Sequence, residues 1–382
     1  MKIVDVSAFY APQGGGVRTY VERKLTAAVR FGHDITVIAP GETSRLEERG
    51  SHARIRWIGA PAFPLDRKYR YFDDEAVLHA ALDEERPDFV EASSPWRSAR
   101  FVANWRGTAP RALIMHADPL SAYAYRWFGR IAERPTIDRY FSWYWRHLLT
   151  LDRRFDLIVS ASGGLSRRLS EGGLSRIATI PMGVDPGVFS PKLRNPALRA
   201  QMLASCGLPE HGTLLVALGR LAPEKRWAMV IEAVMAAGCR APVGLVLIGE
   251  GNEEAKLQRL IGENPHVRLA GAVRDRPLLA QILASGDALI HGCEAETYCI
   301  AAAEAKASGL PLIVPDQGGA ADQATGAADL RYRSGSAKAA ARAILSMSRG
   351  GPATRNPPRV MDDHFAELFG AYAMIAERRA AA

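Results

Sequence analysis

Residues 287–319 (DALIHGCEAETYCIAAAEAKASGLPLIVPDQGG) carry the pattern of a complete strand–helix–strand unit. An apolar run at 288–290 has the length of a buried strand, and a second apolar run follows at 312–314. The alanine-rich residues from about Tyr298 to Ala307 favour a helix, which a glycine and a proline then end. Parallel strands need such a crossover, so the segment predicts a parallel sheet covered by helices.

Two acidic residues flank the start of this predicted helix. Glu296 lies in the loop before it, and Glu304 follows eight residues later, about two turns on and roughly on the same face. The N-terminus of a helix attracts phosphate, which neighbouring carboxylates would repel. The carboxylates are compatible with a phosphate if they accept hydrogen bonds from hydroxyl groups, as on a sugar and a ribose. The segment therefore predicts a site for a nucleotide-sugar.

A second motif, GRLAPEKRW, follows the apolar run at 214–218. Arg220 and Lys225 are five residues apart across this turn, and Lys225 is one of only eight lysines in the chain. Arginine binds phosphate oxygens as a planar fork and lysine as a point charge, so the two cations suit a diphosphate.

The N-terminal part also alternates predicted strands and helices. An apolar run at 2–6 leads into the loop APQGGG, which ends in Gly15 and Gly16 before a helical pattern at 17–31. Glycines at a strand-to-helix turn let the backbone approach a ligand closely, although this loop lacks the dinucleotide pattern GxGxxG. His116 directly follows the predicted strand at 112–115, at the sheet edge where ligands of α/β proteins bind.

Together these motifs resemble the retaining glycosyltransferases of family 4. The resemblance rests on the E-x7-E spacing in EAETYCIAAAE, on GRLAPEK, on GGGVRTYVERK with GHDITVIAP, and on IPMGVDP before a linker. It implies an α/β protein of the GT-B type, with two facing Rossmann-like domains, parallel sheets and a C-terminal helix crossing back to the first domain. The expected parts are an acceptor-binding domain at 1–190, a nucleotide-sugar-binding domain at 191–360 and the returning helix at 361–382.

The resemblance also implies roles for individual residues. Arg220 and Lys225 would stabilise the departing diphosphate, Glu296 would hold sugar hydroxyls, Glu304 the ribose, and His116 would lie near the reacting carbon. The catalytic candidates are therefore His116, Glu296, Arg220 and Lys225. The donor-binding candidates, which lie at turns and helix starts, are Gly15, Gly16, Arg220, Lys225, Gly249, Gly251, Glu296, Thr297, Tyr298, Cys299, Ile300 and Glu304.

The implied activity is metal-independent transfer of a hexose from a UDP- or GDP-linked sugar to a glycan or a lipid-linked acceptor. No cofactor is expected, because the chain contains no DxD metal motif. Cys299 and Met182 stand where the family usually has glycine and asparagine, which keeps a non-catalytic binding protein as an alternative. A nucleotide-sugar epimerase is a second alternative. A nucleic-acid binder is not expected, since the net charge of +8 is not accompanied by any such motif.

Other sequence features bear on location and on metals. The chain has no apolar run of membrane-spanning length and no signal-peptide pattern, and its four cysteines form no disulfide framework, so we expect a cytoplasmic protein. His291, Cys293 and Cys299 suggest a metal, but their spacing matches no zinc pattern, and a buried or lining role is favoured.

Basic and aromatic residues concentrate in one part of the first domain. Residues 97–176 contain fourteen arginines against six acidic residues, which indicates either an arginine-rich composition or an anionic partner such as the inner face of a membrane. Within them, residues 119–150 contain nine aromatic residues and five arginines. Helix–helix packing is the favoured interpretation of this segment, and an acceptor groove or contact with a bilayer is the alternative.

Overall fold

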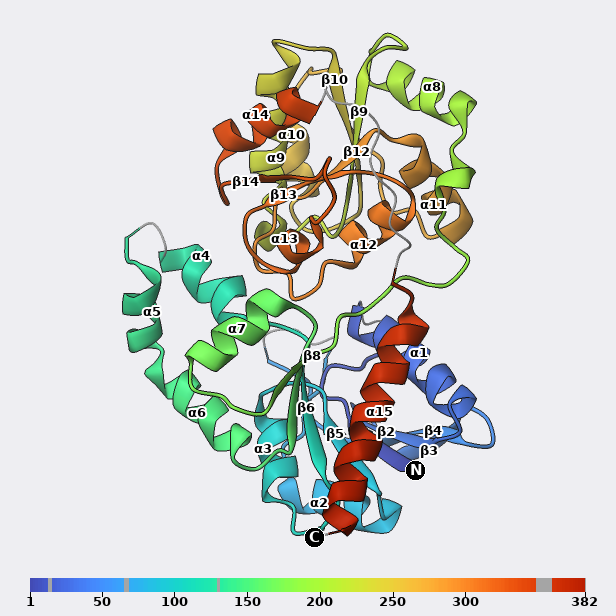
Figure 1. Ribbon diagram of the computed structural model, residues 1–382, viewed down its shortest axis with the longest axis vertical. Coiled ribbons are helices and arrows are strands. Elements are labelled where there is room, and N and C mark those ends of the chain that lie inside the picture. The colour runs from blue at the N-terminus through green and yellow to red at the C-terminus, as the bar shows by residue number, and fades with distance from the viewer. Residues whose placement is uncertain (13–15, 65–68, 129–130, 348–358, 382) are drawn as a thin grey trace. The chain divides into compact units, whose positions relative to one another are not determined.

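The computed structural model describes residues 1–12, 16–64, 69–128, 131–347 and 359–381 (Figure 1). The chain forms two compact units, and it passes from the first to the second at Pro181–Met182. Unit 1 comprises Met1–Asp118, Phe128–Pro181 and Asp362–Ala382, and unit 2 comprises Pro119–Trp127 and Met182–Met361.

Unit 1 is built on an eight-stranded sheet in the order β3-β4-β2-β1-β5-β6-β7-β8. Neighbouring strands are parallel, except that β3 runs antiparallel to β4. From β4 to β7 the order is that of a Rossmann fold, whose ligands bind where the strand order reverses, here between β1 and β5. The strands are β1 (Lys2–Val6), β2 (Asp34–Gly41), β3 (Arg45–Glu48), β4 (Ala53–Gly59), β5 (Phe89–Ala92), β6 (Arg111–Met115), β7 (Leu157–Ser160) and β8 (Ile177–Thr179).

Helices alternate with these strands, as the sequence pattern predicts. Asp74 caps the second of them by accepting hydrogen bonds from the backbone N–H groups of Ala76 and Val77. The helical segments of the first 181 residues are α1 (Gly16–Arg30), α2 (Glu75–Glu85), α3 (Arg97–Asn104), η1 (Leu120–Ala124), α4 (Tyr125–Phe128), α5 (Arg134–Tyr140), α6 (Ser142–Asp152) and α7 (Gly163–Glu171).

The C-terminal helix α15 (Met361–Ala380) packs on unit 1, which confirms the predicted return to the first domain. Its face bearing Phe365, Leu368, Phe369 and Tyr372 is buried. The ring of Tyr372 stacks on that of Phe89 in β5, with 4.1 Å between ring centroids. This helix therefore completes the hydrophobic core of unit 1.

A charged cluster is buried where the strand order of unit 1 reverses. Lys24 in α1 forms ion pairs with Asp5 in β1 and Glu91 in β5, and all three side chains have 0% exposure. Ser93 donates a hydrogen bond to Asp5 at 2.8 Å, and the Tyr372 hydroxyl donates one to Glu91 at 2.7 Å. Charges so deeply buried are tolerated only when they are paired and hydrogen-bonded.

Unit 2 contains a six-stranded parallel sheet in the order β11-β10-β9-β12-β13-β14. This is the complete Rossmann order, with the reversal between β9 and β12. Its strands are β9 (Thr213–Leu218), β10 (Val243–Ile248), β11 (Val267–Leu269), β12 (Ala288–Ile290), β13 (Leu312–Pro315) and β14 (Leu330–Tyr332). The described helices of residues 182–360 are η2 (Pro191–Leu193), α8 (Pro196–Ser205), η3 (Pro223–Lys225), α9 (Trp227–Gly238), α10 (Glu254–Ile261), α11 (Arg276–Ser285), α12 (Ile300–Ala307), α13 (Gly319–Gln323) and α14 (Ala337–Met347).

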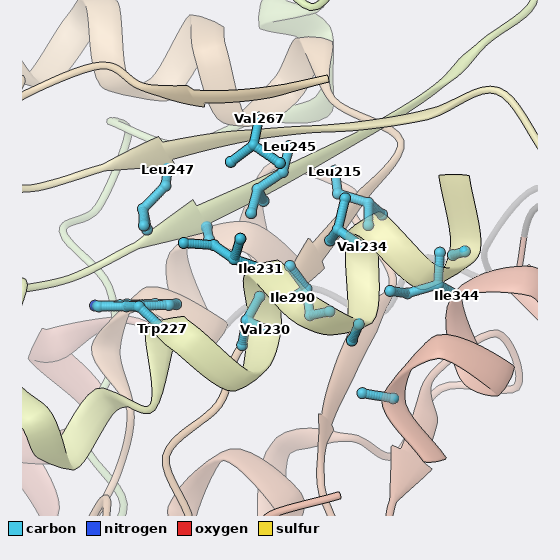
Figure 2. Close-up of a cluster of buried hydrophobic side chains, with 14 of the residues drawn as sticks. Leu215, Trp227, Val230, Ile231, Val234, Leu245, Leu247, Val267, Ile290 and Ile344 are labelled. Carbon is cyan, nitrogen blue, oxygen red and sulfur yellow. The ribbon is translucent and has the colours of Figure 1, made fainter. Parts of the chain in front are cut away.

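The core of unit 2 lies between its sheet and helix α9 (Figure 2). Trp227, Val230 and Ile231 of α9 are completely buried and face strand residues such as Leu245 and Leu247. Burial of apolar surface at about 25 cal/mol per Å² makes this layer the main stabilising element of the unit. The Trp227 indole N–H also donates a hydrogen bond to the backbone oxygen of Arg220 at 2.7 Å, so the core holds the loop after β9.

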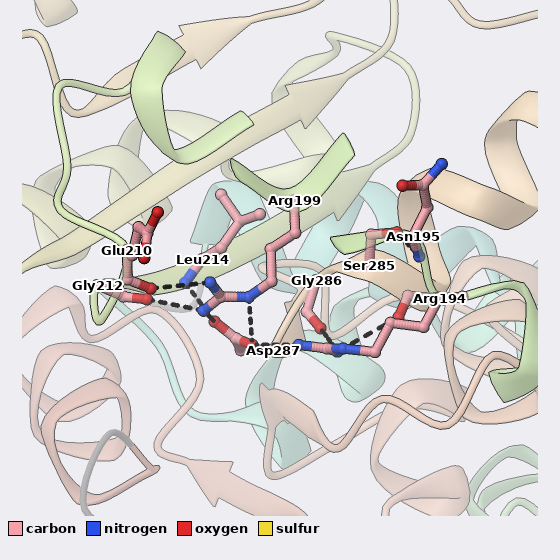
Figure 3. Close-up of polar contacts among 10 residues, drawn as sticks. Arg194, Asn195, Arg199, Glu210, Gly212, Leu214, Ser285, Gly286 and Asp287 are labelled. Atoms are coloured by element: carbon pink, nitrogen blue, oxygen red, sulfur yellow. Dashed lines mark hydrogen bonds and ion pairs between the residues drawn. The ribbon is translucent and has the colours of Figure 1, made fainter. Parts of the chain in front are cut away.

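One carboxylate anchors the start of unit 2 to its sheet (Figure 3). Asp287, just before β12, accepts a hydrogen bond from the Leu214 backbone at 2.8 Å and pairs with Arg199 of α8 at 2.7 Å. Arg194 also pairs with Asp287, at 3.2 Å, and donates to the backbone oxygen of Gly286 at 2.8 Å. The residues that follow the linker are thereby fixed at the sheet edge that carries the amino ends of the strands.

The structure differs locally from the sequence expectations. The sequence pattern does not reveal β3, α3, α14 or β14. Helix α12 begins at Ile300 rather than near Tyr298, because Cys299 has a left-handed backbone (φ 68°). Glu296 lies in the loop before this helix and Glu304 lies within it, as the sequence predicts. Among the described residues, no helix is long and apolar enough to cross a membrane.

Candidate functional site

The loops after β9 and β12 meet at the point where the strand order of unit 2 reverses. The loop after β9 includes the short helix η3 with Lys225, and the loop after β12 runs from His291 to Cys299. A side chain on Gly292 would approach the backbone oxygen of Lys225 to 2.6 Å, so glycine lets the two loops touch. The carboxyl ends of parallel strands at such a reversal are the usual ligand site of the fold.

Lys225, Glu296 and His291 form a charged cluster in these loops. The Lys225 ammonium pairs with Glu296 Oε1, and the side chains retain 16% and 21% exposure. Nε2 of His291 lies 3.3 Å from the same oxygen. Burial alone would lower the pKa of Lys225 and raise that of Glu296, but their attraction reverses both effects, and His291 also lowers the pKa of Glu296. Both groups therefore remain charged at neutral pH.

The loop that carries Glu296 is braced from two sides. Arg226 forms a two-pronged ion pair with Glu294, with one contact at 2.7 Å. The backbone oxygen of Glu296 accepts a hydrogen bond from the Gly319 N–H at 2.7 Å. A Cβ on Gly319 would come within 2.6 Å of the Tyr298 Cα, so only glycine allows this contact. The bracing holds the Glu296 carboxylate in place before any ligand binds.

Thr297, Tyr298 and Cys299 connect Glu296 to helix α12, whose first residue is Ile300. Thr297 and Ile300 are half-buried, whereas Tyr298 and Cys299 are buried. Burial raises the pKa of Tyr298 to about 12 and that of Cys299 well above its ordinary value, so the thiol is protonated at neutral pH. Left-handed backbone costs a non-glycine residue such as Cys299 about 1–2 kcal/mol.

The structure does not bring Glu304 or Arg220 into the Lys225 cluster. Glu304 in α12 is buried and accepts a hydrogen bond from Arg276 at 2.7 Å. Arg276 also contacts Asp185 at 3.1 Å, which links α11, α12 and the segment before η2. The Arg220 side chain is 75% exposed and pairs with Glu224 at 2.9 Å. The ribose and diphosphate roles of these two residues remain predictions.

Gly249 and Gly251 follow β10 and lie against the loop after β9. A Cβ on Gly249 would be 1.9 Å from the backbone oxygen of Gly219, and one on Gly251 would be 2.4 Å from that of Leu221. Gly249 also has a φ of 153°, which favours glycine. These glycines bring two ligand-site loops into backbone contact, and a direct contact with the donor stays a prediction.

Two of the three candidates in unit 1, His116 and Gly16, lie among the described residues. His116 directly follows β6, and its ring meets the Tyr20 ring edge-on at 4.9 Å. Burial, with the nearby Lys24 charge, lowers the pKa of His116 to about 4, so the imidazole is neutral at pH 7. Gly16 is the first residue of α1, and among the described residues no atom lies within 4 Å of where its Cβ would be. Gly15 lies outside the described residues.

Family models match most of the chain. The model described as "Glycosyltransferase Family 4" matches residues 14–188, and "Glycosyl transferases group 1" matches residues 212–349. A Mycobacterium tuberculosis protein, the "GDP-mannose-dependent alpha-(1-6)-phosphatidylinositol dimannoside mannosyltransferase", is 30% identical over 318 residues, covering 82% of this chain and 79% of the relative. The chain belongs to glycosyltransferase family 4. A second M. tuberculosis relative of this family 4 enzyme, a "GDP-mannose-dependent alpha-mannosyltransferase", is 29% identical over 347 residues, covering 85% of the chain and 82% of the relative.

Solved structures support the GT-B fold of this family 4 glycosyltransferase. A sucrose-phosphate synthase from Thermosynechococcus elongatus matches with a TM-score of 0.70 at 18% identity. The match covers 99% of this chain and 98% of that protein. The predicted α/β fold with two Rossmann-like parts is thereby confirmed.

The sequence alone indicates no role for several residues of this glycosyltransferase site. Its patterns mark His291 only as a metal candidate and do not single out Arg226, Glu294 or Arg276. His291 could have been found, because it directly follows a buried strand as His116 does. The partnership of Arg276 with Glu304 spans 28 residues and has no sequence signal.

Proposed function

We propose that this family 4 glycosyltransferase transfers mannose from GDP-mannose to a hydroxyl group of a glycan or lipid-linked acceptor, with retention of anomeric configuration and without a metal. The observation that carries the proposal is the Lys225–Glu296 pair, which lies at the strand-order reversal of unit 2. At this position Lys225 can bind a phosphate of the donor, and Glu296 can accept hydrogen bonds from sugar hydroxyls. Two M. tuberculosis relatives named as GDP-mannose-dependent support GDP-mannose as the donor.

In the proposed reaction, the bond between the anomeric carbon and the diphosphate breaks, and the acceptor oxygen bonds to that carbon on the same face. The acceptor proton passes to the departing GDP. Lys225 and Arg220, with the start of α12, stabilise the charge on the diphosphate. Glu296 holds sugar hydroxyls, and Glu304 holds the ribose. His116 is neutral and can bind a sugar or acceptor hydroxyl as hydrogen-bond donor or acceptor.

Nucleotide binding provides the first test. We expect GDP to raise the unfolding temperature of the purified protein in buffer containing EDTA, and UDP, ADP and dTDP to have much smaller effects. Binding to the folded state alone contributes about 2.7 kcal/mol at a ligand concentration of 100 Kd. Stabilisation by UDP in place of GDP would contradict the choice of donor. A requirement for Mg²⁺ would contradict metal independence, and a product with inverted anomeric configuration, seen by NMR, would contradict retention.

We further propose that α5 and α6 of unit 1 bring the enzyme to an anionic membrane surface that holds the acceptor. Tyr140 and Trp143 are 83% and 52% exposed, whereas Tyr144 and Leu148 of the same segment are buried. Helix packing, the favoured sequence interpretation, therefore accounts for only part of the segment. Exposed aromatic rings beside arginines such as Arg139 suit the interface of an anionic bilayer.

Vesicle binding tests this surface. Replacing Tyr140 and Trp143 with serine is expected to weaken binding to phosphatidylglycerol-containing vesicles by about thirtyfold, equivalent to about 2 kcal/mol of apolar burial. Leu46→Ser is the control, because Leu46 is also exposed (53%) but lies in β3. Flotation of vesicles measures binding. If the double variant and the control bind vesicles equally well, the proposal that α5 and α6 contact the membrane is refuted.

A further inference from the structure

Three potential metal ligands converge beside Lys225 in unit 2. The ligand atoms of His291, Glu296 and Cys299 all lie within 4.8 Å of one another. His291 and Cys299 are 1% and 4% exposed. Ligands in a tetrahedral zinc site are about 3.3–3.8 Å apart, given bond lengths of about 2.0–2.3 Å. Small side-chain rotations would therefore bring the three atoms around one ion.

The histidine supports a ligand at this position independently of the distances. Both ring nitrogens of His291 are buried and make no hydrogen bond among the described residues, and Nε2, the one that faces the cluster, lies 3.3 Å from Glu296 Oε1. The edge of the ring rests against Trp227, with 5.8 Å between ring centroids, which restricts its orientation. Burying a ring nitrogen without a hydrogen bond costs free energy of folding. Coordination to a bound metal would give one of the two nitrogens a partner.

Charge balance also suits a divalent ion. Glu296 supplies one negative charge, and Cys299 supplies a second when its thiol proton is released to solvent on binding. Nitrogen, sulfur and oxygen donors together favour Zn²⁺ over Mg²⁺ or Ca²⁺, which bind oxygen donors. In the absence of an ion, the Lys225 ammonium neutralises Glu296 through Oε1.

We propose that His291, Glu296 and Cys299 form an inhibitory Zn²⁺ site, in which the ion replaces Lys225 at the Glu296 carboxylate. The ion and the ammonium compete for one oxygen, so an occupied site displaces Lys225 and engages Glu296. The inhibition, unlike the metal site itself, rests on the proposed function, because it requires both residues to bind the donor.

Titration with Co²⁺, which substitutes for Zn²⁺ and gives a thiolate charge-transfer band, tests the site without any nucleotide. We expect one Co²⁺ per chain, displaced by Zn²⁺. Cys299→Gly should abolish the band, and because glycine favours the left-handed backbone at this position, unfolding cannot account for that loss. Cys239→Ser is the matched control, since Cys239 is the one exposed cysteine of the four, all of which are described. A band that persists in Cys299→Gly would overturn the proposed ligand set.

A second variant tests the competition. Lys225→Met removes the competing ammonium, so its Co²⁺ affinity should rise by about tenfold or more. Unchanged or weaker affinity would overturn the displacement of Lys225. In transfer assays, each protein is compared with its own zinc-free rate, and Zn²⁺ should inhibit the wild type but not Cys299→Gly. If the wild type shows the Co²⁺ band but is not inhibited by Zn²⁺, the metal site is supported. The proposed binding of the donor by Lys225 and Glu296 is then refuted.

Discussion

Lys225→Ala is expected to abolish detectable GDP binding and to reduce transfer by about a thousandfold. Removing one donor aimed at developing negative charge typically costs about 10²–10³ in kcat. Loss of the ammonium also leaves the half-buried Glu296 carboxylate without its counter-charge, which favours its protonation. Calorimetric titration with GDP and a mannosyl-transfer assay measure the two effects.

Controls separate this loss from unfolding. Lys256→Ala is the matched substitution in the same unit, because the Lys256 side chain is 62% exposed and pairs with Glu253 at 2.8 Å. It should retain GDP binding. Breaking the Lys225–Glu296 pair is expected to lower stability by about 3 kcal/mol, so unfolding of each variant is measured first. Lys225→Ala that is folded and still binds GDP with native affinity would refute the assignment of Lys225 to the diphosphate.

Lys24→Met is expected to have the largest effect on stability. It leaves Asp5 and Glu91 fully buried and close together without a cation, and breaking such a pair typically costs about 3–5 kcal/mol. Urea unfolding followed by fluorescence should therefore show a strongly lowered midpoint. Lys2→Met is the control, since Lys2 is 31% exposed and its partner Glu85 also pairs with Arg54. Its expected cost is about 0–1 kcal/mol.

The loss should depend on pH in a defined direction. Burial already raises the pKa of Asp5 above its ordinary value, although Lys24 opposes this. Removing Lys24 removes that opposition, so the folded variant binds a proton more readily than the unfolded chain. A carboxyl group whose pKa is raised in the folded state stabilises that state at low pH, and this contribution is lost as pH rises. The free energy of unfolding of Lys24→Met should therefore be lower at pH 8 than at pH 5.5. Equal destabilisation at both values would mean that Lys24 acts through packing alone.

Local patterns account for what the sequence could predict. The strand–helix–strand unit at 287–319 and the turn with Lys225 are contiguous, so their types and order follow from hydrophobic runs and helix-forming residues. The family resemblance implies that Lys225 and Glu296 serve one donor site, and the structure pairs the two side chains. The contribution of each to catalysis remains a prediction.

Non-local pairing explains most of what was missed. Asp5, Lys24 and Glu91 come together only because β1 and β5 are neighbours in the sheet, and strand order has no signature in any one segment. The same holds for Arg276 with Glu304. Exposure is also non-local: Trp143 and Tyr144 are adjacent aromatic residues, but only the tertiary packing decides which one is buried.

The return of α15 has a consequence for biosynthesis. Unit 1 needs Phe365 and Tyr372 to complete its core, yet the 180 residues of 182–361 are translated before them. At about 5–20 residues per second, the ribosome takes about 10–40 s over that interval, during which the first 181 residues have an uncovered apolar face. Unit 2 is thus the first part that can finish folding. A chain cut at residue 181 would lack this helix, whereas one that joins 1–181 directly to 362–382 would restore it.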